Sequence, residues 1–404
     1  MKVLYIHLSG VFGGASRSLT EMITHFEENK VEPFIITPEG SFPRVLDKLK
    51  IPYISTLGIT IFDHSRIGHY RWARWLILMR EISFIIPTWK ALKKAKATWS
   101  DIDIIHANEI QCIPSIIMAK HFFKKPVVMH VRSLTHNKPS FRLNLLEKTV
   151  KKYVDEIICI DETVKSYLPK GLDAQVVHNG FTLNSKMSFA DNEIEQSLAA
   201  IPKRQMTVAM VGILIHYKGV MEFLQAAKQC KEQNIDVNFL LVGHNANSIK
   251  GIVKYLIQKF KISSDVAAEV KDYIAAHELE NHVHFLGFTP NVNLVYNNID
   301  VIAFPSYLNA VGRPVFEAAF FKKPSIVAIN DPKPDTIIHL KTGICIPAKD
   351  SIALFEAIKY YFDNPDKRIE MGQNAYELSQ KNFNIKVNAQ KVVDIYEKIM
   401  RDIN

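Results

Sequence analysis

The stretch KVLYIHLSGVFGGASRSL, residues 2–19, combines an apolar run, a loop with two adjacent glycines and the start of a helical pattern. The run KVLYI has the length and apolar character of a buried strand. Gly13 and Gly14 allow the backbone to approach a ligand, and the N–H groups of a helix that starts beside them can hold an anion. This order of strand, glycine loop and helix, the helix expected over about residues 16–28, is typical of an α/β domain.

The same alternation of apolar runs and helical patterns extends along most of the chain. Because the runs are apolar on both faces, they predict parallel sheets that helices cover on both sides. Further strands are expected at residues 33–37, 101–107, 125–131, 155–160 and 174–179, and in a second series at 206–213, 237–243, 282–288, 301–306 and 324–329. We therefore predict two doubly wound, Rossmann-like domains that face each other across a ligand-binding cleft.

The domain boundaries follow from composition. A chain of 404 residues is long for one core. We expect an N-terminal domain over residues 1–185 and a C-terminal domain over residues 200–380. The polar, strandless residues 184–205 are expected to link them, and residues 381–404 to form a helix that crosses back to the N-terminal domain.

The bulk composition indicates a folded globular protein, since 48% of the residues are hydrophobic and 23% are charged. Its cysteines are far apart and form no C-x-x-C pair, which predicts reduced thiols and no zinc site. The N-terminal sequence lacks the cleavage pattern of a signal peptide, and no apolar run reaches the length of a membrane span. We expect a cytoplasmic protein that can be peripheral on the inner face of the cell membrane. The cysteines are Cys112, Cys159, Cys230 and Cys345.

The net charge of +9 belongs almost wholly to the first half of the chain. Residues 1–180 hold 25 Lys and Arg against 17 Asp and Glu, whereas the remainder holds 25 against 24. A basic half suits a nucleic acid, an anionic membrane or an anionic substrate.

Residues 66–99 interrupt the α/β pattern with an amphipathic helical segment. Tryptophans on one side and lysines and arginines on the other are typical of a helix that lies in a membrane interface. The alternative is a pair of helices that covers the core and is kinked near Pro87. The apolar side comprises Trp72, Trp75, Leu76, Met79, Ile82, Ile86 and Trp89, and the basic side Arg71, Arg74, Arg80, Lys90, Lys93, Lys94 and Lys96.

Two loops in the second half carry candidate binding residues. In VGILIHYKGVMEFL, residues 211–224, Lys218 stands where an ammonium group could meet phosphate oxygens. In PSYLNAVGRPVFEAAF, residues 305–320, Pro314 fits the first turn of a helix expected to end at Phe321. Glu317, one turn further, could accept two hydrogen bonds from a sugar diol.

Several motifs together resemble the family 4 retaining glycosyltransferases of the GT-B fold. They are the glycine pair near residue 13, VVHNGF at 176–181, VG-x5-KG at 211–219, VHFLGF at 283–288, PS-x2-N-x2-GR-x3-EA at 305–318 and TGICIPAKD at 342–350. These motifs are distributed over nearly the whole chain, and their order and spacing match the family. The resemblance implies an acceptor-side N-terminal domain, a C-terminal domain that binds a nucleotide-diphosphate sugar, and no metal or other cofactor.

The resemblance also implies site residues. His130, Lys218 and Glu317 would be catalytic, with His130 near the sugar, Lys218 on the phosphates and Glu317 on the ribose. Arg132 would contact the acceptor or a phosphate. Donor binding would involve Gly13, Gly14, Lys218, Asn309, Val311, Gly312, Arg313 and Glu317.

The sequence departs from the family pattern at four positions. Asn309 stands where the first glutamate of the E-x7-E motif is expected, and Ile213 where an arginine is frequent. Asp161 replaces a frequent serine, and Asp335 lies near a glutamate of the family. An amide at residue 309 can still bind a sugar hydroxyl, so the departures predict an altered donor preference or a weaker grip on the donor.

The resulting hypothesis is a glycosyltransferase of the hexosyltransferase type that acts on a lipid-linked or polysaccharide acceptor in bacterial surface glycan biosynthesis. A nucleotide-sugar epimerase or hydrolase of the same fold, and a non-catalytic nucleotide-sugar binder, stay open as alternatives. A nucleic-acid partner is not expected, because the basic residues accompany an apolar tryptophan stripe. Asp101 and Asp103, which match D-x-D, are interpreted as structural because they open a strand rather than end one.

Overall fold

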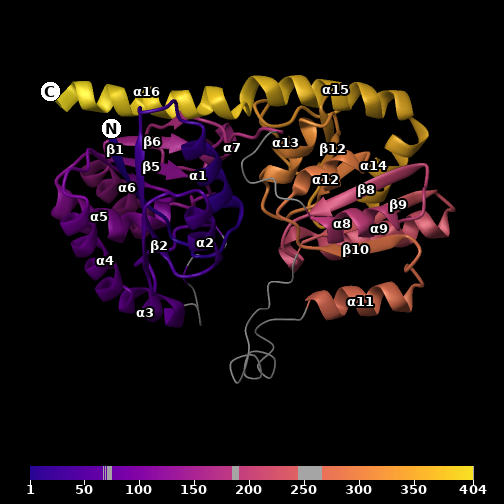
Figure 1. Ribbon diagram of the computed structural model, residues 1–404. Coiled ribbons are helices and arrows are strands. Elements are labelled where there is room, and N and C mark those ends of the chain that lie inside the picture. The colour runs from indigo at the N-terminus through magenta and orange to yellow at the C-terminus, as the bar shows by residue number, and fades with distance from the viewer. Residues whose placement is uncertain (67, 69, 71–74, 184–190, 244–265, 404) are drawn as a thin grey trace. The chain divides into compact units, whose positions relative to one another are not determined.

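The computed structural model describes residues 1–66, 68, 70, 75–183, 191–243 and 266–403. The chain divides into two compact units. Unit 1 comprises Met1–Gly180 and Asn384–Asn404, and unit 2 comprises Phe181–Phe383. Each unit is a parallel sheet with helices on both faces (Figure 1).

Unit 1 contains a seven-stranded parallel sheet in the order β3-β2-β1-β4-β5-β6-β7. Strand β1 lies in the middle, where Val3 pairs with Pro33 on one side and Ile104 on the other. The strands are β1 (Lys2–Ile6), β2 (Glu32–Pro38), β3 (Tyr53–Thr56), β4 (Ile104–Ala107), β5 (Val127–Val131), β6 (Glu156–Cys159) and β7 (Gln175–Val176).

Alternate strand residues of unit 1 point to two helical layers. Tyr5 and Val128 pack in one cluster with Leu19 of α1 and with Val392 and Tyr396 of α16. Helices α4, α5 and α6 pack against one another elsewhere in the unit. The helices are α1 (Gly14–Thr24), α2 (Ser41–Lys48), α3 (Trp75–Ser83), α4 (Ile85–Thr98), α5 (Ile113–Phe123), α6 (Phe141–Tyr153), α7 (Glu162–Ser166) and α16 (Ile385–Ile403), with a 3-10 turn at Ile110–Cys112.

Helix α1 begins two residues earlier and ends four residues earlier than expected. Gly13 is its N-cap, and the Gly13 backbone N–H donates to Ser16 Oγ at 2.7 Å, which closes the first turn. The helix ends where the His25 N–H bonds to the Met22 carbonyl at 3.2 Å, three rather than four residues back.

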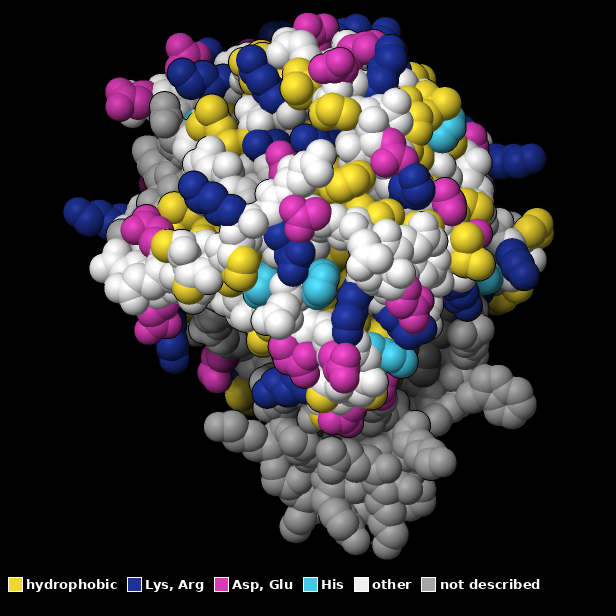
Figure 2. Space-filling model, turned by 90° about the vertical axis from the view of Figure 1, so that its right-hand side faces the viewer, with side chains coloured by type: hydrophobic (Ala, Val, Ile, Leu, Met, Phe, Trp, Pro, Cys, Tyr) yellow, Lys and Arg dark blue, Asp and Glu magenta, His cyan; other side chains and the backbone are white. Residues whose placement is uncertain are grey.

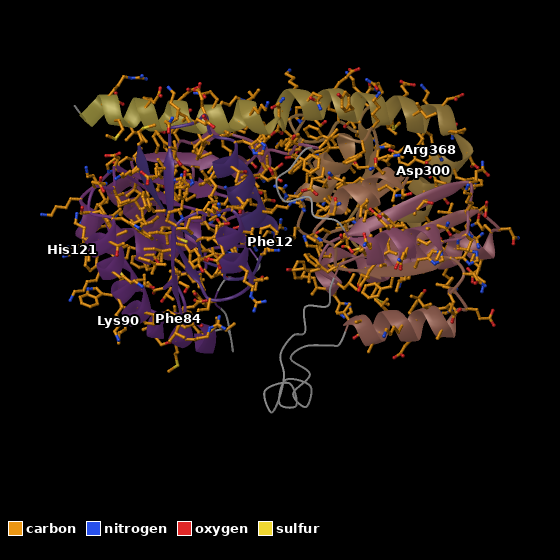
Figure 3. All side chains as sticks on the ribbon, viewed as in Figure 1. Phe12, Phe84, Lys90, His121, Asp300 and Arg368 are labelled. Carbon is orange, nitrogen blue, oxygen red and sulfur yellow. The ribbon has the colours of Figure 1, made fainter. Side chains whose placement is uncertain are left out.

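The alternative interpretation of this segment was a helix pair kinked near Pro87, and the break between α3 and α4 lies at Phe84. Pro87 lies in the first turn of α4, where its missing N–H leaves no helical hydrogen bond unmade. Figure 3 labels Phe84, at the N-terminus of α4, and Lys90, within α4. Residues Arg71, Trp72 and Arg74 lie outside the described part of the chain.

Unit 2 contains a six-stranded parallel sheet in the order β10-β9-β8-β11-β12-β13. The strands are β8 (Met206–Val211), β9 (Val237–Val242), β10 (Val283–Gly287), β11 (Val301–Phe304), β12 (Ser325–Ala328) and β13 (Gly343–Ile346). The helices are α8 (Asn192–Ala199), α9 (Val220–Glu232), α11 (Val266–Ala276), α12 (Val292–Asn297), α13 (Arg313–Ala319), α14 (Ser351–Asp363) and α15 (Pro365–Asn382), with a 3-10 turn η3 at His216–Lys218.

Two apolar layers also cover the unit 2 sheet. Val208 and Phe239 pack with Phe223 of α9 and Phe355 of α14. The neighbouring strand residues Ala209 and Leu240 face the other way, toward α12 and α13, and pack with Val295, Tyr296 and Ala318.

Every strand expected from the sequence is present, and two more strands lie at sheet edges. The additional strands are β3 and β13, each of four residues. Helix α13 begins one residue earlier than expected and ends at Ala319, two residues short of Phe321. Part of the segment expected to be a linker forms α8, which buries Ile194 within unit 2.

Candidate functional site

In unit 2, the loop after β8 lies against the carboxyl end of β11. Gly219 has a φ of 82°, a conformation that favours glycine, and a Cβ there would lie 2.2 Å from the Pro305 carbonyl oxygen. The glycine therefore allows a close approach of the two backbones. The Tyr307 N–H also donates to the Tyr217 carbonyl at 2.9 Å, which fixes the two loops to each other.

Phe304, the last residue of β11, brings Lys218 and Gly312 together. Lys218 Nζ lies 4.9 Å from the centre of the Phe304 ring, and a Cβ on Gly312 would come within 2.3 Å of the same ring. Burial lowers the pKa of Lys218. A bound anion would stabilise the protonated form of such a desolvated ammonium group, because a nearby negative charge favours the charged state.

Arg313 and Tyr296 hold the carboxylate of Glu317. Arg313 Nη2 and Nε lie 2.7 and 2.9 Å from Glu317 Oε1, and the Tyr296 hydroxyl donates to Oε2 at 2.8 Å. The glutamate is 3% exposed. Glu317 is therefore a fixed, buried carboxylate, and its assignment to the ribose stays a prediction.

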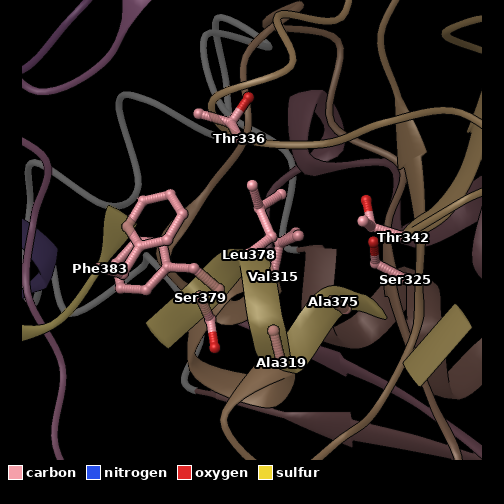
Figure 4. A pocket seen from close by; sticks show the side chains of 10 residues that line it. Val315, Ala319, Ser325, Thr336, Thr342, Ala375, Leu378, Ser379 and Phe383 are labelled. Carbon is pink, nitrogen blue, oxygen red and sulfur yellow. The ribbon is translucent and has the colours of Figure 1, made fainter. Parts of the chain in front are cut away.

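The side of α13 that carries Val315 and Ala319 lines a small pocket shared with α15 (Figure 4). Thr336, Ser379 and Phe383 contribute to the same lining. Lys218, Gly312 and Arg313 do not line it, so this pocket is separate from the candidate donor residues.

Asn309 has a structural reason to be an asparagine. Its φ is 56°, in the left-handed region that asparagine adopts more readily than glutamate. Its Oδ1 accepts a hydrogen bond from the Asn330 backbone N–H at 2.7 Å. Val311, half-buried, packs with the cluster that contains Phe304 and Val315.

The other departures from the family pattern differ in their surroundings. Asp161 caps α7 by accepting from the Val164 N–H at 2.6 Å, which explains an acidic residue there. Ile213 is exposed on the loop after β8. Nothing in the structure explains the exchange at Asp335.

In unit 1, His130 and Arg132 are joined to neighbours that the motifs did not single out. Arg132 donates from Nε to Asn108 Oδ1 at 2.8 Å, from Nη1 to Asn179 Oδ1 at 2.6 Å and from Nη2 to His130 Nδ1 at 3.2 Å. The Asn108 amide nitrogen in turn lies 2.9 Å from His7 Nδ1 and 3.5 Å from the Ala15 carbonyl, next to Gly14.

The histidines of this group are buried and neutral. Burial and the nearby Arg132 cation lower the pKa of His7 to about 3 and hold the pKa of His130 well below its usual range. Glu109 lies beside them, and burial raises the pKa of its carboxyl group. His7, Asn108 and Asn179 were missed in the sequence, although Asn179 belongs to the quoted VVHNGF motif.

Helices α3 and α4 expose several large apolar side chains, whereas Ala91, Leu92 and Ala95 of α4 are buried. Met79 and Ile86 are 67% and 63% exposed, and Trp75, Ile82 and Trp89 are also exposed. Phe141, the first residue of α6, is 84% exposed and was not predicted. In the part of the chain that the structure describes, no helix has the length and hydropathy needed to cross a membrane.

Tyr70 connects the start of α6 with α3. The Arg142 guanidinium lies 4.4 Å from the centre of the Phe62 ring and 5.1 Å from that of Tyr70. Tyr70 in turn stacks on Trp75, with 5.8 Å between ring centres. We call Trp75, Met79, Ile82, Ile86, Trp89 and Phe141 the apolar surface of unit 1.

Comparison with known proteins identifies the family. The model of the Glycosyl transferases group 1 matches residues 191–378, and that of Glycosyltransferase Family 4 matches residues 12–185. The chain therefore belongs to the family 4 glycosyltransferases, and its fold is GT-B, as the sequence predicted.

Individual relatives agree with this family at low identity. The capsular polysaccharide biosynthesis glycosyltransferase CapM of Staphylococcus aureus is 21% identical over 65% of this chain and 66% of its own, so the match spans just under two thirds of CapM. The N,N'-diacetylbacillosaminyl-diphospho-undecaprenol alpha-1,3-N-acetylgalactosaminyltransferase of Campylobacter jejuni is 22% identical over 95% of each chain. The crystal structure of Anabaena Alr3699/HepE with UDP and glucose has a TM-score of 0.75 at 20% identity, covering 98% of this chain and 100% of that one.

Proposed function

We propose that the protein is a retaining glycosyltransferase of the hexosyltransferase type, with a nucleotide-diphosphate sugar as donor. The observation that carries this proposal is the arrangement around Phe304, where the half-buried Lys218 and the Gly312 backbone both lie against the same ring at the carboxyl end of β11. Ligands of open α/β sheets bind at this end of the strands. The glycosyltransferase family and a fold neighbour that holds UDP and glucose support the choice of donor.

The chemistry that this site would perform is stabilisation of a leaving group. As the bond between the sugar and the diphosphate breaks, negative charge develops on the phosphate oxygens. Lys218 would neutralise part of that charge, and burial makes its interaction stronger than in water. We propose that the chain supplies this charge without a metal ion.

The acceptor is proposed to be a lipid-linked or polysaccharide glycan in bacterial surface glycan biosynthesis. The named relatives support this class, since one acts in capsule biosynthesis and another carries a diphospho-undecaprenol substrate in its name. His130 and Arg132 of unit 1 are proposed to serve the sugar and acceptor side.

We also propose that the apolar surface of unit 1 holds the protein at an anionic membrane. Its tryptophans and aliphatic residues are exposed rather than packed in the core. Lys90, Lys93 and Lys94 of α4 lie on the same helix and would meet lipid phosphates. On the face of the molecule in Figure 2, by contrast, apolar side chains are scattered among residues of both charges.

A direct test measures the release of nucleoside diphosphate from a panel of nucleotide sugars, with and without undecaprenyl-diphosphate-linked acceptors. We expect release that requires both a donor and an acceptor and that Lys218→Met abolishes. Release without any acceptor would instead favour a hydrolase, and conversion of the donor sugar without acceptor or net release would favour an epimerase.

A second candidate function is a non-catalytic nucleotide-sugar binder. Asn309 favours it, because the side chain that replaces the family's glutamate bonds to the Asn330 backbone through its Oδ1. Calorimetric binding of a donor sugar with no turnover for any acceptor would support this candidate over a transferase.

A further inference from the structure

Three neighbouring strands of unit 1 end in polar side chains on the face that α1 and α16 cover. Each strand contributes two residues separated by one position, so both side chains point to the same face. A covered face of a parallel sheet is ordinarily apolar, which makes a polar array here a feature to explain. The polar array consists of Tyr5 and His7 at the end of β1, His106 and Asn108 at the end of β4, and His130 and Arg132 at the end of β5.

Arg132 sets the direction of the hydrogen bonds in this array, because a guanidinium group only donates. Its Nε donates to Asn108 Oδ1 at 2.8 Å, so this atom is the amide oxygen and accepts. The other end of the Asn108 amide is therefore the NH2 group. It points at the Ala15 carbonyl at 3.5 Å, which can only accept and thus agrees with this orientation.

His7 receives the second bond from Asn108. The Asn108 Nδ2 lies 2.9 Å from His7 Nδ1, and an NH2 group at this distance requires the imidazole nitrogen to accept. A neutral histidine that accepts through Nδ1 carries its proton on Nε2. The His7 Nε2 atom is buried and has no hydrogen-bond partner among the described residues.

His130 is fixed in the same way, but directly by Arg132. Nη2 of Arg132 donates to His130 Nδ1 at 3.2 Å, so the proton of this imidazole also lies on Nε2. Its Nε2 is likewise buried without a partner in the described part of the chain, and His130 lines a small pocket with Arg132 and Asn179. His106 differs, because its partner is the Tyr396 hydroxyl, which can either donate or accept.

We propose that Arg132 is a positioning residue that, directly and through Asn108, locks His130 and His7 in the tautomer with the proton on Nε2. Each imidazole then presents a fixed N–H donor to an oxygen atom of the bound sugar or its diphosphate. This role of the donors rests on the proposed function, whereas the tautomers themselves do not. Arg132 acts through its neighbours, in place of the direct substrate contact that the sequence suggested.

The locked tautomer limits the chemistry of His130. A neutral imidazole that is protonated on Nε2 and accepts from Arg132 on Nδ1 has no lone pair left to act as a general base. The site would therefore stabilise the departing diphosphate and orient the sugar, without withdrawing the acceptor proton through this residue. The titratable and charged groups around the array are Tyr5, His106, Glu109, Arg132, His178 and Tyr396.

The test of the tautomers is nitrogen NMR of the full-length protein labelled with ¹⁵N-histidine, assigned with His7→Gln and His130→Gln. We expect a protonated Nε2 and an unprotonated Nδ1 for both residues from about pH 8 to about pH 5, with no titration in this window. Protonation of Nδ1, or titration of either residue in this range, would overturn the proposal.

Asn108→Asp tests the chain of donors, with Asn179→Asp as its matched control. Both substitutions place a carboxylate where an amide oxygen accepts from Arg132, at 2.8 and 2.6 Å. Only the aspartate at 108 also faces His7, and without an NH2 group it requires His7 Nδ1 to donate. We expect His7 to switch tautomer in Asn108→Asp alone, while His130 keeps its tautomer in both; an unchanged His7 would contradict the relay.

Kinetics test the positioning role of Arg132. In Arg132→Met, His130 loses its hydrogen-bond donor and its neighbouring cation. We therefore expect kcat to fall at least about tenfold, while the KM for the nucleotide sugar stays within about threefold of the wild-type value. Activity should also acquire a loss toward acid pH that the wild type lacks, because the pKa of His130 rises. Wild-type kcat and pH profile would overturn the positioning role. If the wild type transfers no sugar while both tautomers are as expected, the proposed function is wrong, whereas the assignment of the two tautomers remains valid.

Discussion

Arg313 and Glu317 form a buried ion pair one turn apart at the start of α13, with Arg313 Nη2 2.7 Å from Glu317 Oε1. Tyr296 completes the arrangement by donating to the other carboxylate oxygen. The geometry gives Glu317 one orientation before any ligand binds. A ribose diol that bonded to this carboxylate would meet a preorganised acceptor.

Removing the charge of Glu317 is expected to weaken both the fold and donor binding. In Glu317→Gln, Arg313 keeps a buried charge without its partner, so the free energy of unfolding should fall by about 3 kcal/mol. Urea denaturation measures this loss. The double variant with Arg313→Met serves as control, since removing both charges should cost less than the sum of the single changes. If the loss in the double variant equals the sum of the losses in the two single variants, the two residues are not coupled.

Lys218→Met is expected to weaken binding of a nucleoside diphosphate by about 10- to 100-fold while changing nucleoside binding little, because the lost bond is charge-assisted. Calorimetry measures both affinities. Lys228→Met is the control, since Lys228 pairs with Glu232 on a solvent-facing part of α9. An equal loss for nucleoside and diphosphate would place Lys218 away from the phosphates.

The lowered pKa of Lys218 also gives a pH dependence with a definite sign. Because burial favours the neutral amine, Lys218 loses its proton at a lower pH than an exposed lysine, and a bound diphosphate reverses this shift. Diphosphate affinity should therefore fall as pH rises through the lowered pKa. The affinity of Lys218→Met should lack this decline, and a decline of equal size in the variant would contradict the assignment.

The buried histidines predict a loss of stability toward acid pH. His7, His106 and His130 are neutral in the folded protein down to low pH, because burial lowers their pKa values, that of His7 to about 3. The unfolded chain takes up protons near the usual value of 6.5, so the unfolded state binds more protons below that pH. The unfolding free energy should then fall as pH drops, by up to about 4 kcal/mol per pH unit near pH 5.

Denaturation curves between about pH 7 and about pH 5 check this expectation. His7→Gln should flatten the decline by about a third. His121→Gln is the control, since His121 is exposed on α5 (Figure 3). A decline that His7→Gln and His121→Gln change equally would count against the neutral array.

Replacing exposed apolar residues of unit 1 is expected to release the protein from anionic vesicles. Ile86→Ser with Trp89→Ser removes two large side chains that would enter the lipid, and vesicle affinity should drop at least about tenfold. Flotation with phosphatidylglycerol vesicles measures it. Ile352→Ser with Ile369→Ser, which changes two exposed isoleucines of unit 2, should bind as the wild type does. Equal retention of all three proteins would contradict the membrane assignment.

The sequence predicted the strands well because each central strand is covered on both sides and reads as an apolar run. Two edge strands, β3 and β13, were missed, whereas the other two edge strands, β7 and β10, were predicted. In β3, Ser55 and Thr56 interrupt the apolar run. The break expected near Pro87 lies at Phe84, because proline is tolerated in the first turn of a helix. The start of α4 at Ile85 could not be deduced from periodicity.

The candidate site was predicted only where a motif is continuous in sequence. Lys218 and Gly312 were each identified in a separate loop. Their shared contact with Phe304 could not be identified in the same way, because it depends on the order of the strands in the folded sheet. The positioning role that we propose for Arg132 could not be predicted from the sequence, because its partners, Asn108 and Asn179, are 24 and 47 residues away. Tertiary neighbours of this kind decide whether a polar side chain binds a ligand or orients another residue.

The central claim is that unit 2 binds a nucleotide-diphosphate donor through Lys218. A thermal-shift screen of the wild type and Lys218→Met against nucleoside mono- and diphosphates tests it most directly, because a ligand that binds only the folded state raises the melting temperature. We expect at least one nucleoside diphosphate to stabilise the wild type more than its monophosphate does, and Lys218→Met to abolish that difference. If no diphosphate raises the melting temperature, or if Lys218→Met responds as the wild type does, the claim is contradicted.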